Sequence, residues 1–291
     1  MNRRKKIMWI IGIISLIILA VIIWFNVPLS PLKGKFKTII AENIKENYDQ
    51  YGSLANEIYT DQDIKNLPNI LQKYFRYTGL IGKQKIYNVH VVYGSTDFKL
   101  SQDKPMLKIN YEHYNFLKDL DRVASINTSM MGIPFEGLDN YTNGIGSMKG
   151  MLAKSVTLFN VTGFEMNVSS LVTCLSEMIF LPTVALQDNV VWESIDENTA
   201  KANIEDNGQK ASAIFKFNDN GEIISVETDD RYMDEGNGKS SKNKWVVEAS
   251  EYIEENGIKY PSKAKVTWKL STGDYTYFDG KDIKIEYNVS K

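Results

Sequence analysis

An uninterrupted apolar segment near the N-terminus constrains this chain more than any other feature. It runs from Ile7 to Phe25 without a charged residue and follows the basic sequence MNRRKK. As a helix it would be roughly 28 Å long, close to the thickness of the hydrocarbon core of a bilayer. Trp9 and Trp24 lie near its two ends, where indole rings favour the membrane interface. The segment therefore predicts a transmembrane helix over residues 7–25.

A cleavable signal peptide is the alternative for this segment. Signal peptides usually have a shorter apolar region, of about 7–15 residues, that ends in small residues. Here the segment ends in WFNVPLSP, with no A-x-A pattern and no cysteine directly after it for lipidation, so an uncleaved anchor is favoured. The basic residues before the span favour a cytoplasmic tail of residues 1–6 with the rest of the chain outside. Lys33, Lys35 and Lys37 lie beyond the span and weaken this orientation without reversing it.

Composition and charge limit the classes of partner. The chain has 34 basic and 36 acidic residues, and without the four basic residues of the tail the remainder carries a net charge of −6. Nucleic acid is therefore not an expected partner, because phosphate binding requires a basic surface. The single cysteine, Cys174, excludes an intrachain disulfide and a cysteine-rich metal site. With 43% hydrophobic residues, the chain can form a sizeable core.

Helical patterns come first after the apolar segment. Residues 26–60 begin with Pro28 and Pro31 and then become polar and lysine-rich, which predicts a juxtamembrane spacer with some helix. A clearer helix follows in LPNILQKYFRYTG, where Pro68 suits the first turn and Gly79 the end. Its apolar stripe consists of Ile70, Leu71, Tyr74 and Phe75.

From Lys85 onward the apolar period changes from 3.6 to 2, which is typical of strands. In KAKVTWKL the apolar residues Ala264, Val266, Trp268 and Leu270 alternate with lysines and Thr267. Asn220-Gly221 lies between two such segments and predicts a tight hairpin. We expect about ten to twelve strands, and one-sided alternation indicates an antiparallel sheet with one solvated face. The predicted class is mainly β with flanking helices (α+β), with a β-rich extracytoplasmic domain over residues 61–291.

The stretch LVTCLSEMIFLPTVAL, residues 171–186, interrupts this β pattern. It predicts a helix that begins at Ser169 or Ser170 and ends before Pro182. Its apolar face would carry Leu171, Val172, Cys174, Leu175, Met178 and Ile179. Ser170, Thr173 and Glu177 would form a polar stripe on the other face, flanked by Phe180 and Leu181. The periodicity therefore places Glu177 at a partly solvated position.

Motif searches favour neither an enzyme nor a metal site. GIGSMKG misses the dinucleotide-binding spacing by one residue, and neither G-x-S-x-G nor H-E-x-x-H occurs. The two histidines, His90 and His113, lie on predicted strands. His113 continues the apolar face of its strand, which favours a buried histidine with one hydrogen bond over a catalytic one. We therefore assign no catalytic residue, metal or cofactor.

The acidic run ETDDRYMDE, residues 227–235, is interpreted as a solvated loop, because its spacing does not match an EF-hand. Asp230-Arg231-Tyr232 is alternatively a structural ion pair with an aromatic neighbour. Trp192, Trp245 and Trp268 are more typical of a core than of a ligand platform.

Several of these segments together resemble a family of uncharacterised bacterial membrane-anchored proteins, a domain of unknown function. They are LPNILQKYFRYTGLIGK, LSEMIFLPTVAL, VVWESIDENTAKANI, IFKFNDNGEIISVETDDRYM, YIEENGIKYPSKAKVTWKL and YTYFDGKDIKIEY, within roughly residues 65–288. The family helix commonly reads Glu, an aromatic pair, then Pro; Glu177 and Pro182 match, whereas Ile179 stands where an aromatic is usual. The resemblance implies a specific role for Glu177, either ligand contact or a buried helix-to-sheet hydrogen bond.

The same family is similar to lipoprotein-carrier half-barrels. This resemblance implies a curved antiparallel sheet that wraps one or more helices and encloses an apolar cavity. Fold alone does not fix function, and the family brings no assigned activity.

Three hypotheses follow for the function. The first is a non-enzymatic, membrane-tethered domain that binds a lipid or other apolar ligand outside the cytoplasmic membrane. The second is an envelope interaction or scaffolding module, with an unknown protein partner and no cavity above roughly 300 Å³. The third is a hydrolase that uses Glu177, or His113 with a carboxylate. The candidate ligand-binding residues are Glu177, Thr173, Phe180, Leu181, Trp192, Trp268 and His113.

Overall fold

The computed structural model describes residues 3–27, 30–236 and 239–290, so Met1 and Asn2 of the predicted tail and Pro28 of the predicted spacer lie outside the described residues. The helices are α1 (Arg3–Asn26), α2 (Pro31–Tyr51), α3 (Asp61–Ile64), α4 (Asn69–Tyr77) and α5 (Phe164–Ser176), with short 3₁₀ turns at Gly52–Asn56, Lys118–Leu120, Glu177–Ile179 and Pro182–Leu186. The strands are β1 (Asn88–Phe98), β2 (Leu107–Phe116), β3 (Arg122–Met130), β4 (Ile133–Thr142), β5 (Ile145–Leu152), β6 (Val156–Thr162), β7 (Val190–Asp196), β8 (Thr199–Asp206), β9 (Gln209–Phe217), β10 (Ile223–Thr228), β11 (Tyr232–Gly236), β12 (Lys239–Lys242), β13 (Lys244–Glu255), β14 (Ile258–Leu270) and β15 (Gly273–Tyr287).

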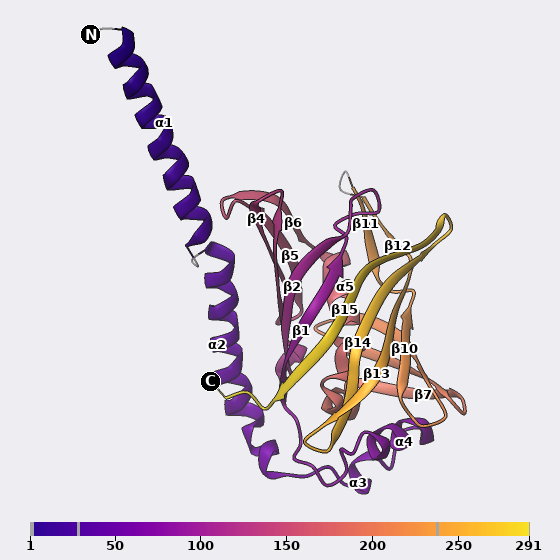
Figure 1. The fold of residues 1–291 in the computed structure, drawn as a ribbon. Coiled ribbons are helices and arrows are strands. Elements are labelled where there is room, and N and C mark those ends of the chain that lie inside the picture. Colours follow the sequence, from indigo (N-terminus) through magenta and orange to yellow (C-terminus); the bar gives the residue numbers. More distant parts are fainter. Residues whose placement is uncertain (1–2, 28–29, 237–238, 291) are drawn as a thin grey trace.

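One antiparallel sheet dominates the fold. Within the described residues it has 13 strands in the order β6-β5-β4-β3-β2-β1-β15-β14-β13-β10-β9-β8-β7, and β11 and β12 form a separate hairpin. The sequence predicted fewer strands. The sheet is strongly curved and open, and α5 lies on its concave side (Figure 1). A sheet of this many strands must curl, because each strand is twisted relative to the next. The prediction of a curved antiparallel half-barrel around a helix is confirmed.

Alternation along the strands sets which side chains face the concave side. In the pairing of β13 with β14, Trp245 lies opposite Trp268 and Ala249 opposite Ala264, and all four are buried. The lysines between the apolar residues of β14 point outward and pair with carboxylates, as Lys265 does with Glu248 at 2.7 Å. The predicted two-residue period of this strand is therefore confirmed.

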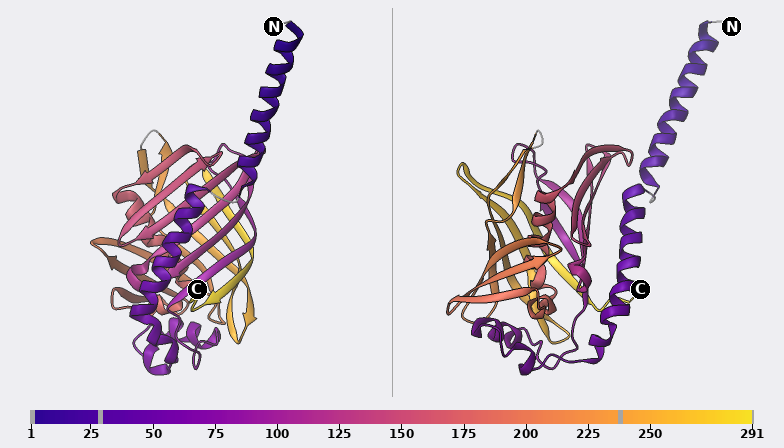
Figure 2. Two further views of the ribbon diagram at one scale, coloured as in Figure 1. Left: turned by 90° about the vertical axis from the view of Figure 1, so that its left-hand side faces the viewer. Right: turned by 180° about the vertical axis from the view of Figure 1, so that it is seen from behind.

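Two local predictions are also confirmed by the structure. β9 and β10 are joined by a tight turn in which Gly221 has φ of +99°, a backbone conformation that favours glycine. Helix α4 buries the four residues of its predicted apolar stripe. Together with α3 it lies at one end of the half-barrel (Figure 2, right).

Helix α5 begins at Phe164, well before the predicted start at Ser169 or Ser170. The predicted polar stripe is not solvated, because Ser170 and Thr173 are buried between the helix and the sheet. Gly146, in the segment GIGSMKG, explains how the helix comes so close. A Cβ atom on Gly146 would lie 2.5 Å from the carbonyl oxygen of Met166, so only glycine permits this helix–strand contact.

The segment that the sequence predicted as a spacer with some helix contains the 21-residue helix α2. It crosses the outer face of the sheet (Figure 2, left). Leu32, Phe36 and Ile44 of α2 pack against Phe116 and other apolar residues of that face. The outer face of the sheet is therefore covered at this point and not entirely wet.

Helix α1 is long and apolar enough to cross a membrane, and its membrane-length window is fully exposed in the structure. It extends away from the sheet (Figure 1). The turn between β5 and β6 binds its C-terminal end: the Nζ of the buried Lys154 donates to the carbonyl oxygens of Trp24 at 2.8 Å and Phe25 at 3.0 Å. The indole of Trp24 donates in turn to the carbonyl oxygen of Ala153 at 3.0 Å. A cation at a helix C-terminus compensates the partial negative charge of the last carbonyls.

Candidate functional site

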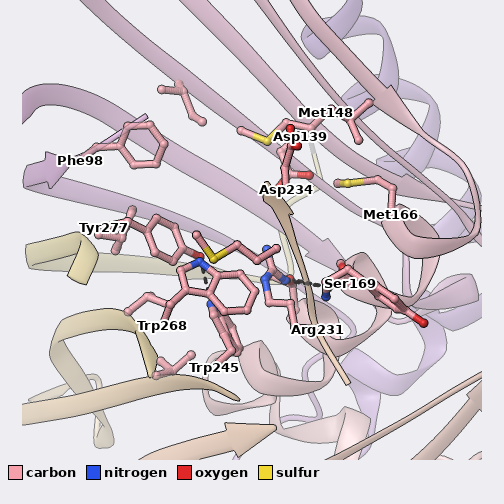
Figure 3. Close-up of a pocket in the computed structure, with 18 of the residues that line it drawn as sticks. Phe98, Asp139, Met148, Met166, Ser169, Arg231, Asp234, Trp245, Trp268 and Tyr277 are labelled. Atoms are coloured by element: carbon pink, nitrogen blue, oxygen red, sulfur yellow. Dashed lines mark hydrogen bonds between the residues drawn. The ribbon is translucent and has the colours of Figure 1, made fainter. Parts of the chain in front are cut away.

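A cavity of about 780 Å³ lies between the concave face of the sheet and helix α5. Strands β1–β6 and β13–β15 contribute to its wall, and the β11–β12 hairpin contributes residues from the opposite side. The wall on β1 and β13–β15 is rich in aromatic side chains (Figure 3), among them Phe98, Trp245, Trp268, Tyr275, Tyr277 and Phe278. Because the indole of Trp245 donates to the Tyr277 hydroxyl at 3.1 Å, part of this aromatic wall is tied together across the sheet.

Glu177 and Arg122 lie in the wall of the cavity, where α5 passes into its 3₁₀ turn. The Nε of Arg122 donates to Oε2 of Glu177 at 2.7 Å, and Nη2 donates to Oε1 at 3.0 Å. Nη1 of Arg122 donates to Asp139 on β4 at 2.8 Å, and Nη2 also donates to the Tyr111 hydroxyl at 2.8 Å. A planar guanidinium suits such a two-pronged contact with a carboxylate. The interaction joins strand β3 to the helix.

A second group of polar residues completes this network. Asn115 on β2 donates its amide to Oε2 of Glu177 at 2.8 Å, and its amide oxygen is 2.6 Å from Nδ1 of His113. His113 is fully buried, and its Nδ1 lies 3.5 Å from Glu177. Its Nε2 is buried and has no hydrogen-bond partner among the residues that the structure describes. The predicted buried histidine with one hydrogen bond is therefore confirmed.

The surroundings of the network determine its protonation. Burial alone would raise the pKa of Glu177. The positive charge of Arg122 and the hydrogen bonds that Glu177 accepts from Arg122 and Asn115 outweigh burial and lower that pKa to about 2. Burial lowers the pKa of His113 to about 4, which the neighbouring Glu177 only partly offsets. At neutral pH the glutamate is therefore ionised and the histidine is neutral.

The network is poorly suited to acid–base catalysis. Glu177 and His113 do converge within a short distance, as the hydrolase hypothesis requires. A general base, however, works best with a pKa near the operating pH, and both pKa values lie well below it. The neighbouring thiol of Cys174 is buried, and burial raises its pKa, so it is an inert core residue. The hydrogen bonds of the network join the end of the helix to strands β2 and β3, and Arg122 extends it to Asp139 on β4.

Arg231 does not form the ion pair that the sequence predicts for it. The predicted ion pair within Asp230-Arg231-Tyr232 is wrong: Asp230 pairs with Lys242 at 2.9 Å and accepts from the backbone of Ser212. The guanidinium of Arg231 stands over the ring of Trp245, with 4.6 Å from its central carbon to the ring centroid. The acidic run is also not simply a solvated loop, because it forms the end of β10 and the start of the β11–β12 hairpin.

The structure brings together four of the seven candidate residues. Thr173, Glu177, Phe180 and Trp268 line the cavity. The other three do not. Leu181 is buried in the core, and Trp192 packs edge-on against Phe215 with its indole donating to the carbonyl oxygen of Ala185 at 3.1 Å. His113 lies behind the cavity wall, and Asn115 forms hydrogen bonds with both His113 and Glu177.

Sequence reasoning missed Arg122 and the role of Arg231. Arg122 shares the inward face of β3 with Ala124 and Ile126, so a charged residue in phase with apolar residues was the available signal. For Arg231 we find no comparable local signal. Among the described residues, no group of three or more histidines, cysteines or carboxylates is arranged to hold a metal ion.

Comparison with known proteins places the chain in a family. We found no match among curated proteins. Among solved structures, a LolA superfamily protein from Nitrosomonas europaea is similar, with 14% sequence identity and a TM-score of 0.35, over 78% of this chain and 93% of that one. The sequence model of a family of unknown function, DUF6544, matches residues 57–280, in agreement with the resemblance of these segments to a family without assigned activity. The chain therefore belongs to the DUF6544 family.

Proposed function

We propose that this chain is a membrane-tethered, non-enzymatic domain that binds a lipid or another apolar ligand outside the cytoplasm. The observation that carries the proposal is the cavity of about 780 Å³ on the concave side of the sheet. Pockets that bind small molecules commonly measure about 300–1,000 Å³. A scaffolding module with a packed interior gives no reason for a cavity of this size.

The chemistry of the lining supports an apolar ligand. Trp245, Trp268 and Phe278 present large apolar surfaces, and Val266 and Ala264 extend the same wall. Removing such surfaces from water is favourable, at about 25 cal/mol per Å², so an acyl chain that covers them binds without specific polar contacts. The charged residues of the wall lie on α5 and its 3₁₀ turn, on β3 and β4, at the β11–β12 hairpin, and directly after β1, where Lys99 follows the strand.

The N-terminal helix supports a location at the membrane. We propose that α1 is an uncleaved single span with its N-terminus in the cytoplasm, because basic residues precede it. Lys154 and Trp24 connect the end of α1 to the β5–β6 turn, so the domain would stay close to the bilayer surface. A domain held there can exchange an apolar ligand with the membrane without releasing it into water.

Ligand uptake tests this function. The full chain, transferred from detergent to an amphipathic polymer and delipidated, is titrated with a fluorescent fatty acid. We expect saturable binding that an unlabelled fatty acid reverses. If the protein takes up no acyl ligand, while circular dichroism confirms its β content, the proposed function is wrong.

A further inference from the structure

Arg231 is held firmly by contacts on one side of its guanidinium. Its Nη1 donates to the carbonyl oxygen of Ser169 at 2.7 Å and to the hydroxyl of Thr173, both on helix α5. The plane of the guanidinium stands over Trp245, which is a favourable cation–π arrangement. The side chain is therefore oriented before any ligand arrives.

The opposite edge of the same guanidinium has no partner. The Nε of Arg231 is buried and meets no acceptor, and Nη2 donates to no acceptor in the described part of the chain. Within residues 3–27, 30–236 and 239–290, no carboxylate forms an ion pair with Arg231. Buried donors are almost always hydrogen-bonded, so an unpaired edge on a cavity wall calls for an explanation.

Arg122, in the same cavity wall, indicates what this edge can bind. Nε and Nη2 of a guanidinium project side by side, and in Arg122 these two atoms hold both carboxylate oxygens of Glu177. Arg231 lines the same cavity, and its equivalent edge carries the same pair of donors without an acceptor in the described part of the chain. Its natural complement is a group with two oxygens that share a negative charge.

Outside the cluster around Arg122, the cavity wall carries a small excess of positive charge. Four basic residues (Lys99, Arg122, Arg231 and Lys239) and four acidic residues (Asp139, Glu165, Glu177 and Asp234) line it. Asp139 and Glu177 are bound to Arg122. That cluster has a net charge of −1, and the remaining lining, with three basic residues against two acidic ones, has a net charge of +1. The wall as a whole is neutral, and an anion at Arg231 neutralises the part that is positive.

We propose that the Nε–Nη2 edge of Arg231 binds the oxyanion head group of an amphiphile, a carboxylate or a phosphate. This inference rests on the proposed function and names the class of ligand. Trp245, Trp268 and Tyr277 lie together on one side of Arg231, and Ser169 on the other (Figure 3). The chain of the amphiphile therefore runs from Arg231 along the aromatic wall, with its apolar atoms against Trp268 and Phe278.

The test compares head groups on one chain length. The full chain in an amphipathic polymer is titrated with radiolabelled hexadecanoate, hexadecyl phosphate and neutral hexadecanol. We expect at least one of the two anions to bind about 10- to 100-fold more tightly than the alcohol, the usual gain from a charge-assisted hydrogen-bonded pair. The preferred anion tells a free fatty acid from a phospholipid-like head group.

Three variants isolate the free edge of Arg231. Arg231→Gln should reduce the preference for the anion to less than about threefold and leave hexadecanol binding unchanged. Thr173→Val removes one of the two contacts that orient Arg231 but not the free edge, so it should reduce the preference less than Arg231→Gln does. Arg76→Gln, at an exposed arginine that pairs with Asp61 away from the cavity, is the matched control and should retain the preference.

The outcomes separate this inference from the proposed function. If none of the three compounds binds, hexadecanol included, the proposed function itself fails. If all three bind the wild type equally, or if Arg231→Gln keeps the preference for the anion, the inference about Arg231 is wrong and the apolar cavity remains a binding site. Should Arg231→Gln not fold, Arg231→Lys keeps the charge without the two-pronged edge and is expected to lose most of the preference.

Discussion

Arg122 and Glu177, 55 positions apart in the sequence, form a two-pronged ion pair that fastens the end of helix α5 to strand β3. The Arg122 side chain is almost completely buried, and that of Glu177 is 13% exposed. Asn115 and Asp139 complete the hydrogen bonding of the pair. This contact fixes the position of the helix that forms one side of the cavity, so the geometry of the cavity depends on it.

Replacing Arg122 with methionine should destabilise the protein by about 3–5 kcal/mol, since the carboxylates of Glu177 and Asp139 then remain buried without their cation. Urea unfolding of the full chain, followed by circular dichroism, measures the change. The double variant Arg122→Met/Glu177→Gln should be more stable than Arg122→Met alone. A loss below about 1 kcal/mol for Arg122→Met, in the range of a surface ion pair, would contradict the role we assign to it.

His113 should make a contribution to the stability of the protein that is lost as the pH falls from about 6.5 to about 4. Its pKa is about 4 in the folded chain, below its ordinary value near 6.5, because burial disfavours the charged ring. In this interval the unfolded chain binds the proton and the folded chain does not, so the contribution is present above pH 6.5 and is lost as the pH falls. Below that interval, protonation of Glu177 removes a further contribution as the pH approaches about 2.

The difference between the wild type and His113→Phe isolates this effect. Burial raises the pKa of Asp121 to about 7, and this group changes stability in the opposite direction, so the total curve of the wild type is not sufficient. Unfolding free energies measured at several pH values should show that the wild type loses stability relative to the variant from pH 6.5 to 4. Parallel curves for the two proteins would exclude His113 as a source of the pH dependence.

Ala264→Trp should block ligand uptake without unfolding the protein, because Ala264 faces the cavity and the added indole occupies part of it. We expect the affinity for a fluorescent fatty acid to fall by tenfold or more, equivalent to about 1.4 kcal/mol or more. Lys265→Trp is the matched control. It adds the same side chain to the neighbouring position of β14, where Lys265 points outward and pairs with Glu248. Equal affinities for the two variants would place the ligand elsewhere.

Lys154→Met should loosen the connection between α1 and the domain. The ammonium group of Lys154 is the donor to the last carbonyl oxygens of α1, and methionine keeps the length of the side chain without the donor. Amide hydrogen exchange of the full chain in lipid nanodiscs is expected to become faster at residues 22–27. Unchanged exchange there would show that Trp24 alone is sufficient to fix the end of the helix.

Local patterns were enough to predict much of the fold. The alternation in KAKVTWKL, the Asn220-Gly221 turn and the stripe of α4 depend on residues close together in sequence, and each formed as expected. The start of α5 was not predicted, because Gly163 rather than a serine precedes it and because Phe164, Met166 and Val168 alternate with polar residues, as in a strand.

The candidate site was only partly predictable because its contacts are long-range. The sequence indicated Glu177, but its partner Arg122 comes from a strand that nothing in the local pattern connects to the helix. Whether Trp192 or Trp268 lines the cavity depends on where the sheet curves, and alternation gives both residues an inward side without distinguishing core from cavity. A residue that lines a cavity differs from a core residue only in having empty space where the core residue has a packed neighbour.

Native mass spectrometry of the full chain, released from detergent micelles and followed by organic extraction of bound molecules, tests the central claim most directly. We predict a wild-type mass increased by a bound lipid or other amphiphile, and an unliganded mass for Ala264→Trp prepared in the same way. If the wild type has only the unliganded mass, even after incubation with membrane lipids, the claim that the cavity is a binding site for an apolar ligand is contradicted.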